Sequence, residues 1–123
     1  MNYNKNIILD ILRSNFFEEI ETFVTNYVLD LEENDLIMFF ETSVDYAMLD
    51  YIEEISVVYY EVEKEEGQDN ISGMINVIAE IDGYLHWDGE ENFVGSNEIE
   101  IGIDFSFYEE NNDFFDIELE DVY

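Results

Sequence analysis

The feature that most constrains the fold is a strict alternation of apolar and polar side chains near the C-terminus. Between positions 98 and 107, apolar residues recur at every second position, and the positions between them are mostly acidic. This period of two is that of a β-strand with one buried and one exposed face. The apolar residues are Ile99, Ile101, Ile103, Phe105 and Phe107, and the carboxylates on the other face of the same strand are Glu98, Glu100 and Asp104.

Three further runs, 55–64, 71–81 and 115–120, repeat the β-strand period. A polar loop that contains Gly67 separates the first two runs. Such strands predict an antiparallel sheet with one buried face and one acidic, solvated face. In the last run Phe115, Ile117 and Leu119 are expected on the buried face. The acidic face would include Asp116, Glu118 and Glu120, and the loop before this run adds Glu109, Glu110 and Asp113.

Two dipeptides typical of tight turns, Asp82-Gly83 and Asp88-Gly89, lie between the second run and the alternating C-terminal one. Aspartate followed by glycine accepts the positive φ angles of two-residue hairpin turns. We therefore expect the residues between the two dipeptides, 84–87, to form a short strand that pairs back through a hairpin.

The N-terminal part of the chain has a helical period instead. Ile8, Ile11 and Leu12 indicate one helix, and apolar residues over 16–31 follow the 3.6-residue period for four turns. Ser43, as an N-cap, predicts a third helix over 44–55, whereas the apolar run 36–40 fits either a helix or a strand. The expected fold class is α+β. N-terminal helices, mainly within 1–54, would pack on a four- to five-stranded antiparallel sheet, 55–123, in a single domain 1–123.

Charge restricts the function more than any motif does. The chain has 33 Asp and Glu against three Lys and Arg, a formal net charge of −30, yet 47% of its residues are hydrophobic, which is too many for a disordered tail. Thirty charges equal those of ~15 base pairs of duplex DNA. Such a field repels nucleic acid and anionic membranes, so we expect neither as a partner. It favours a strongly basic protein surface, and basic surfaces in cells mostly bind nucleic acid.

Catalytic and metal-binding chemistry finds little support in the sequence. His86 is the single histidine and stands beside Trp87, so we expect it to be a partly buried member of an aromatic cluster. Cysteine is absent, and the acidic stretch from Asp88 to Asn92 lacks the ligand spacing of a calcium loop. Paired carboxylates occur by chance among so many acids. We expect a protein that is not an enzyme, with no catalytic residues, no metal and no cofactor.

The one-sign acidic face calls for an explanation, because like charges directly opposite across strands destabilise a sheet. Alternate residues on one strand face lie ~6.6 Å apart, which is comparable to the separation of phosphates along a winding DNA strand. A basic groove that binds phosphates would accept carboxylates in such a row, arginine often in bidentate fashion. The candidate partner-binding residues are Glu98, Glu100, Asp104, Glu109, Glu110, Asp113, Asp116, Glu118 and Glu120; the rival face is Glu18, Glu19 and Glu21 near a helix N-terminus.

In this acidic composition the chain resembles the small DNA-mimic proteins with which phages and mobile elements inhibit restriction, CRISPR or repair enzymes. The resemblance implies a non-catalytic inhibitor, of the anti-restriction or anti-CRISPR type, that occupies the basic groove of a nucleic-acid-binding protein such as a nuclease. Two alternatives stay open: an immunity protein that neutralises a basic nuclease toxin, and a chaperone of histone-like proteins. We expect a cytoplasmic protein, in the host cytoplasm if a phage encodes it, and leave open whether it forms a homodimer.

Overall fold

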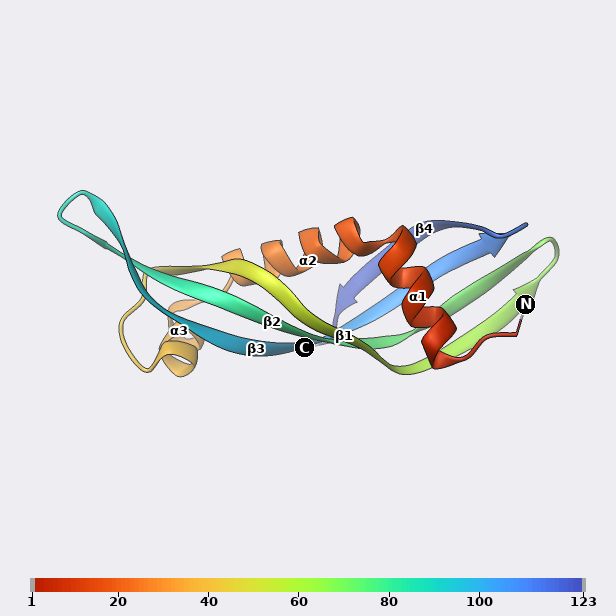
Figure 1. Ribbon diagram of the computed structural model, residues 1–123, viewed down its shortest axis with the longest axis horizontal. Helices are drawn as coiled ribbons and strands as arrows, with labels where there is room; N and C mark the ends of the chain where they lie inside the picture. Colours follow the sequence, from red (N-terminus) through yellow and green to blue (C-terminus); the bar gives the residue numbers. More distant parts are fainter. Residues whose placement is uncertain (1, 123) are drawn as a thin grey trace. The chain divides into compact units, whose positions relative to one another are not determined.

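The computed structural model describes residues 2–122, which form an α+β fold with three helices followed by a four-stranded antiparallel sheet (Figure 1). The strand order, β1-β2-β3-β4, follows the chain, so each strand pairs with its sequence neighbour. This confirms the predicted fold class in its main features. The elements are α1 (Lys5–Asn15), α2 (Phe17–Leu29), α3 (Glu33–Phe40), β1 (Tyr46–Glu65), β2 (Gln68–Trp87), β3 (Glu90–Glu110) and β4 (Asp113–Asp121).

The long strands and the helices contribute to two compact units. Unit 1 contains residues 2–20, 55–77 and 101–122, and unit 2 contains residues 21–54 and 78–100. Each unit has its own section of the three long strands, and each is described separately below. None of the helices within residues 2–122 has the length and apolar composition needed to cross a membrane.

In unit 1, α1 buries the side chains of Ile8, Ile11 and Leu12. The side chain of Asn4 caps α1 by accepting a hydrogen bond from the backbone N–H of Ile7 at 2.9 Å. Next to the end of this helix, the ring of Phe16 lies 5.2 Å from that of Phe107 on β3, measured between ring centroids. Phe107 is fully buried and also contacts Phe114 on β4. The unit therefore has a continuous aromatic and aliphatic core.

In unit 2, α3 packs against β2 at a glycine. A Cβ atom at Gly83 would lie 2.9 Å from the ring of Phe40, so this position has no room for a side chain without movement of that ring. The side chain of Asn97 on β3 donates a hydrogen bond to the backbone carbonyl of Phe39, at the same end of α3. These contacts fix the C-terminal end of α3 on the sheet of unit 2.

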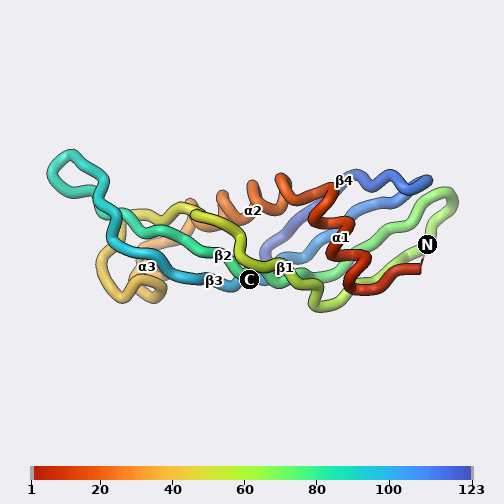
Figure 2. The backbone as a smooth tube through the Cα atoms, in the orientation of Figure 1, coloured from red at the N-terminus to blue at the C-terminus, as the bar shows by residue number. Residues whose placement is uncertain are grey.

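The tight turns explain where the strands end. Asp88 and Gly89 have φ angles of 55° and 79°, and Asn111 and Asn112 have φ angles of 52° and 67°. Two consecutive positive φ angles are typical of the type I′ turn, whose twist matches that of a hairpin. The prediction of a turn at Asp88-Gly89 is confirmed. Figure 2 shows this turn at the tip of the β2–β3 hairpin, which extends beyond α3 within unit 2.

Three local predictions are wrong. The segment 46–55, expected as a helix after Ser43, belongs to β1, and the third helix lies earlier, at Glu33–Phe40. The backbone N–H of Asp45 bonds to the carbonyl of Tyr84 at 2.9 Å, so pairing with β2 overrides the weak local helical pattern. Asp82-Gly83 is not a turn, because β2 continues through it to Trp87. The glycine there is explained by the close approach of α3.

The third error concerns β4. Ser106 pairs with Glu118, and Tyr108 pairs with Phe115. Between these two pairs β4 contains one residue more than β3, which is a β-bulge, and Asp116 in it has a φ of 55°. Phe115 therefore faces the same side as Tyr108, with ring centroids 5.9 Å apart, and Phe114 contacts Phe107 instead. Phe115, Ile117 and Leu119 were expected on one buried face. Phe115 and Leu119 instead lie on opposite faces, because a bulge reverses the side on which later residues point.

Candidate interaction surfaces

The acidic face of unit 1 lies on β3 and β4, opposite to the buried residues of β3. Asp104 is paired directly with Glu120, and Ser106 with Glu118, while Phe105 and Leu119 form the pair that faces the other side. Directly paired residues in an antiparallel sheet have Cβ atoms ~4.5–5.5 Å apart. Asp104, Glu118 and Glu120 are all exposed. The structure thus brings three of the predicted partner-binding carboxylates together on one face.

The β3–β4 turn adds a second carboxylate pair to unit 1. Glu110 and Asp113 are paired directly on either side of the turn, on the same face of β3 as Tyr108 and Asp104. The stacked rings of Tyr108 and Phe115 lie on this face too. We define Asp104, Glu110, Asp113, Glu118 and Glu120 as the unit 1 acidic face.

Two predicted residues of unit 1 are not members of these carboxylate pairs. Asp116 occupies the bulge. Glu109 forms a side-chain hydrogen bond with Tyr3, and its Oε1 atom accepts one from the backbone N–H of Asn112 at 2.8 Å. Burial, together with the nearby charges of Glu109 and Asp69, raises the pKa of Tyr3 to about 12. Glu109 therefore holds the N-terminal segment and the turn.

In unit 2 the predicted residue Glu98 belongs to a row of carboxylates across three neighbouring strands. Glu98 on β3 forms a side-chain hydrogen bond with Glu53 on β1, and Glu80 on β2 is a further negative charge near Glu53. The hydrogen bond and the charge of Glu98 raise the pKa of the Glu53 carboxyl, because the shared bond requires a proton and the neighbouring charges oppose ionisation. We call Glu53, Glu80 and Glu98 the carboxylate row.

Tyrosine side chains contact the carboxylates of unit 2. The hydroxyl of Tyr51 donates a hydrogen bond to Glu80 Oε2 at 3.3 Å, and the negative charge of Glu80 raises the pKa of Tyr51. A hydrogen bond with Glu91 is the main cause that raises the pKa of Tyr46 to about 12. The other predicted residue of this unit, Glu100, is exposed on β3.

The two units differ in their charge. All three cationic residues, Lys5, Arg13 and Lys64, belong to unit 1, which contains 16 acidic residues. Unit 2 contains the other 17 acidic residues and no lysine or arginine, so its formal net charge is −17 against −13 for unit 1. Unit 2 therefore carries more negative charge per residue than unit 1.

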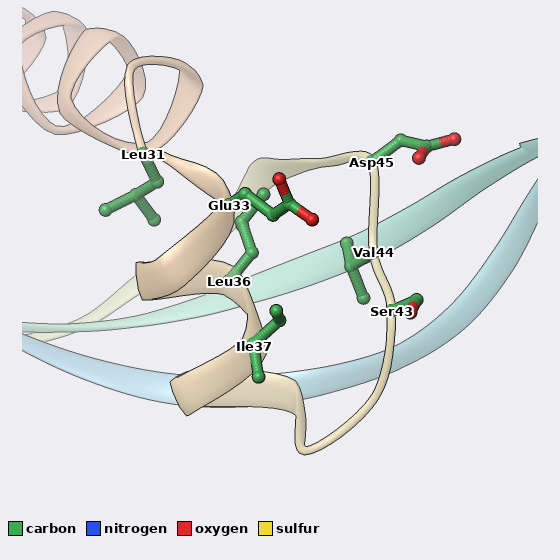
Figure 3. Close-up of a pocket in the computed structure, with 7 residues that line it drawn as sticks. All are labelled: Leu31, Glu33, Leu36, Ile37, Ser43, Val44 and Asp45. Carbon is green, nitrogen blue, oxygen red and sulfur yellow. The ribbon is translucent and has the colours of Figure 1, made fainter.

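A pocket of about 350 Å³ opens in unit 2 between α3 and the chain segment that leads into β1. Figure 3 shows Leu36 and Ile37 on α3 and Val44 on the following segment, with the carboxylates of Glu33 and Asp45 on one side of them. Carboxylates with aliphatic side chains beside them suit the charged end and the aliphatic stem of an arginine or lysine side chain. The remaining lining residues are Leu31 and Ser43.

The remaining candidates receive less support from the geometry. Glu18 and Glu19 lie in the first turn of α2, where negative charge complements the helix dipole, so their position has a structural explanation. His86 is exposed, which corrects the expectation of a partly buried histidine, and its backbone N–H donates to Asp45 Oδ2 at 2.6 Å. Within residues 2–122, no group of three or more His, Asp or Glu side chains has the arrangement needed to hold a metal ion.

Sequence reasoning missed the two most exposed aromatic side chains among residues 2–122. Trp87, next to the β2–β3 turn, is 71% exposed, and Phe93 on the opposing strand is 60% exposed. The signal that could have identified Trp87 is an aromatic residue directly before an Asp-Gly turn. Glu53 was missed because it lies in the segment that was expected to be helical. No protein-family model, curated protein or solved structure gives a significant match to this chain.

Proposed function

We propose that this protein is a non-catalytic inhibitor that mimics DNA and occupies the basic nucleic-acid-binding groove of a defence or DNA-processing enzyme, such as a CRISPR nuclease or a restriction enzyme. The observation that carries the proposal is the ordered arrangement of carboxylates on rigid strands. Asp104 and Glu120 are held directly opposite each other in unit 1, and the carboxylate row extends over three strands in unit 2.

The spacing of the carboxylates on the strands supports this function. Neighbouring strands lie ~4.8 Å apart, and alternate residues along a strand ~6.6 Å apart. Carboxylates on such a lattice present negative charge at intervals similar to those of phosphates along a DNA strand. A groove of arginine and lysine side chains that binds phosphates can therefore bind the carboxylates with the same hydrogen-bond donors.

The cost of this arrangement is a second line of support. Paired like charges and a surplus of 30 negative charges both work against the folded state. Lysines beside these carboxylates would remove this cost, yet the sequence from 65 to 123 contains no lysine or arginine. A basic partner would compensate for the repulsion when it binds.

A second candidate is an immunity protein that neutralises a basic nuclease toxin. The exposed side chains of Trp87 and Phe93 favour it, because apolar anchors recognise one particular protein surface and have no counterpart on a DNA backbone. In that case the protein would block the toxin beside its active site, and DNA could still reach part of the groove.

The experiment first identifies a target and then tests competition. Proteins that the immobilised chain retains from a bacterial lysate are purified, and each is titrated with a labelled DNA duplex of ~15 base pairs, which carries the same number of charges. For a DNA mimic we expect mutually exclusive binding of the duplex and this protein, and weaker binding of both with added salt. Simultaneous binding with unchanged affinities would contradict occupancy of the groove.

A further inference from the structure

The tip of the β2–β3 hairpin in unit 2 leaves a large aromatic side chain exposed to water. Trp87 is the most exposed large apolar residue among residues 2–122, and Phe93 lies on the opposing strand of the same hairpin. The type I′ turn at Asp88-Gly89 joins the two strands directly. A tryptophan left in water at a hairpin tip contributes little to stability, and its large apolar ring is of the kind that anchors contacts with another protein.

The hairpin that carries Trp87 is held in place. The ring of Phe93 packs edge-on against Tyr84 with centroids 5.9 Å apart, and Tyr84 stacks on Tyr46 at 5.4 Å. Asp45 adds two hydrogen bonds, one from its backbone N–H to the carbonyl of Tyr84 and one accepted by its carboxylate from the N–H of His86. A braced hairpin loses less conformational entropy on binding than a free loop would.

The chemistry around the tip limits what can cover it. Carboxylates surround the aromatic side chains along the hairpin, and unit 2 contains no lysine or arginine. A second copy of the same tip would bring like charges together, and an anionic lipid surface would be repelled in the same way. The complementary surface is a basic protein surface with an apolar recess. The carboxylates on either side of the tip are Asp45, Asp88, Glu90 and Glu91.

We propose that Trp87 is an anchor that inserts into an apolar recess between arginine or lysine side chains of the partner protein. The inference rests on the proposed function, since it takes the same basic partner, and it adds the source of specificity. Charge alone attracts any basic surface, whereas a buried tryptophan distinguishes the surface that has a recess of the right shape. Tryptophan is among the residues that most often dominate the energy of protein interfaces.

The protein carries its own reporter, because Trp87 is the only tryptophan in the chain. Two tryptophan-free peptides of equal length and equal positive charge serve as probes, one alternating arginine with leucine and one alternating arginine with serine. We expect the arginine–leucine peptide to shift the Trp87 emission to shorter wavelength and to bind about tenfold more tightly than the arginine–serine peptide, since only leucine offers an apolar surface.

Single substitutions test the contribution of the Trp87 side chain separately from that of the negative charge. By calorimetry, Trp87→Ala should lose the preference for the arginine–leucine peptide and keep its affinity for the arginine–serine peptide. The matched control, Tyr59→Ala, removes a half-exposed aromatic ring from unit 1 and should keep the preference.

Each outcome has a defined meaning. Equal affinities for the two peptides without an emission shift, or a preference that survives in Trp87→Ala, would overturn the anchor and leave the proposed function standing. If neither peptide binds at low salt, the attraction to basic surfaces is absent and both proposals fail. If both peptides bind as expected but the DNA duplex and this protein bind the captured partner simultaneously, the anchor stands and groove occupancy fails.

Discussion

Unit 1 and unit 2 use their apolar residues differently. Of the 22 buried apolar side chains among the described residues, 14 belong to unit 1, whereas eight of the 11 exposed large apolar side chains belong to unit 2. The cationic residues follow the same division, since Lys5, Arg13 and Lys64 are all in unit 1. Unit 1 therefore has the larger core and some internal charge compensation, and unit 2 has the more negative and more apolar surface.

This difference shows that one strongly acidic composition is compatible with two different distributions of apolar side chains in one chain. Burial of apolar area is the main source of stability, so the unit with more of it is expected to determine the free energy of unfolding. Unit 2 exposes aromatic side chains to water and contains 17 acidic residues without a lysine or arginine. These features make its own contribution to the free energy of folding less favourable. We propose that its surface serves binding.

The largest expected effect tests this division on stability. Phe107→Ala should lower the free energy of unfolding by about 3–5 kcal/mol, because Phe107 is fully buried and contacts Phe16, Phe105 and Phe114. Trp87→Ala in unit 2 should change it by less than about 0.5 kcal/mol, as is usual for exposed positions. Urea denaturation measures both. Comparable losses would mean that the hairpin tip is part of the structural core.

A smaller effect compares two glycines on the same strand. A Cβ at Gly73 in unit 1 would overlap the backbone carbonyl oxygen of Tyr59, whereas one at Gly83 in unit 2 would press on the ring of Phe40. A ring can move aside more easily than the backbone of a paired strand. We expect Gly73→Ala to cost about 1–3 kcal/mol of folding free energy, and Gly83→Ala to cost less. The order of the two melting temperatures checks this prediction, and a lower value for Gly83→Ala would contradict it.

The sequence predicted those features of the fold that depend on local pattern. Alternation along 98–107 identified β3 and its buried face, and Asp88-Gly89 identified the hairpin turn. The prediction of a helix over 44–55 is wrong for the part that belongs to β1, because its apolar residues fit a helical period as well as a strand. Pairing with β2 decides between the two, and such pairing is a long-range property.

The candidate site was less accessible to sequence reasoning. Membership of Glu98 in an acidic face follows from alternation, but its contact with Glu53 depends on the register of three strands, which the sequence does not specify. The bulge at Asp116 likewise has no signal that distinguishes it from a regular strand position. What determines the site is thus cross-strand geometry, and the sequence supplied only the residues of each strand.

A third prediction asks which unit dominates binding. Changing Glu53, Glu80 and Glu98 together to lysine, or Asp104, Glu118 and Glu120 together to lysine, alters the net charge equally. We expect the unit 2 triple to weaken competition with the ~15-base-pair duplex about tenfold more than the unit 1 triple, or roughly 1.4 kcal/mol. The reason is that the surface of unit 2 has no lysine or arginine and also carries Trp87.

Competition titrations against a captured target measure this difference, with melting curves to verify that both variants fold. Equal losses from the two triples would show that overall charge alone drives binding. A larger loss from the unit 1 triple would place the binding surface on Asp104, Glu118 and Glu120, as the sequence analysis expected for these residues.

The smallest effect concerns pH and is specific to the carboxylate row of unit 2. The pKa of Glu53 is raised by its hydrogen bond with Glu98 and by the charges of Glu98 and Glu80. With a raised pKa, the folded state binds more protons than the unfolded state over the range from the ordinary glutamate pKa, ~4.3, to the raised value. Stability should therefore fall as the pH rises through this range and should stay lower at neutral pH.

Glu53→Gln should remove this contribution, since an amide cannot ionise and can still donate a hydrogen bond to Glu98. We expect the variant to have a higher melting temperature than the parent protein at pH 7, and the difference to shrink as the pH falls to ~4, where the parent carboxyl is also protonated. Glu98→Gln should reduce the same pH dependence, because it removes the main cause of the shift. A melting-temperature difference for Glu53→Gln that stays constant from neutral to acidic pH would show that the two carboxyl groups do not share a proton.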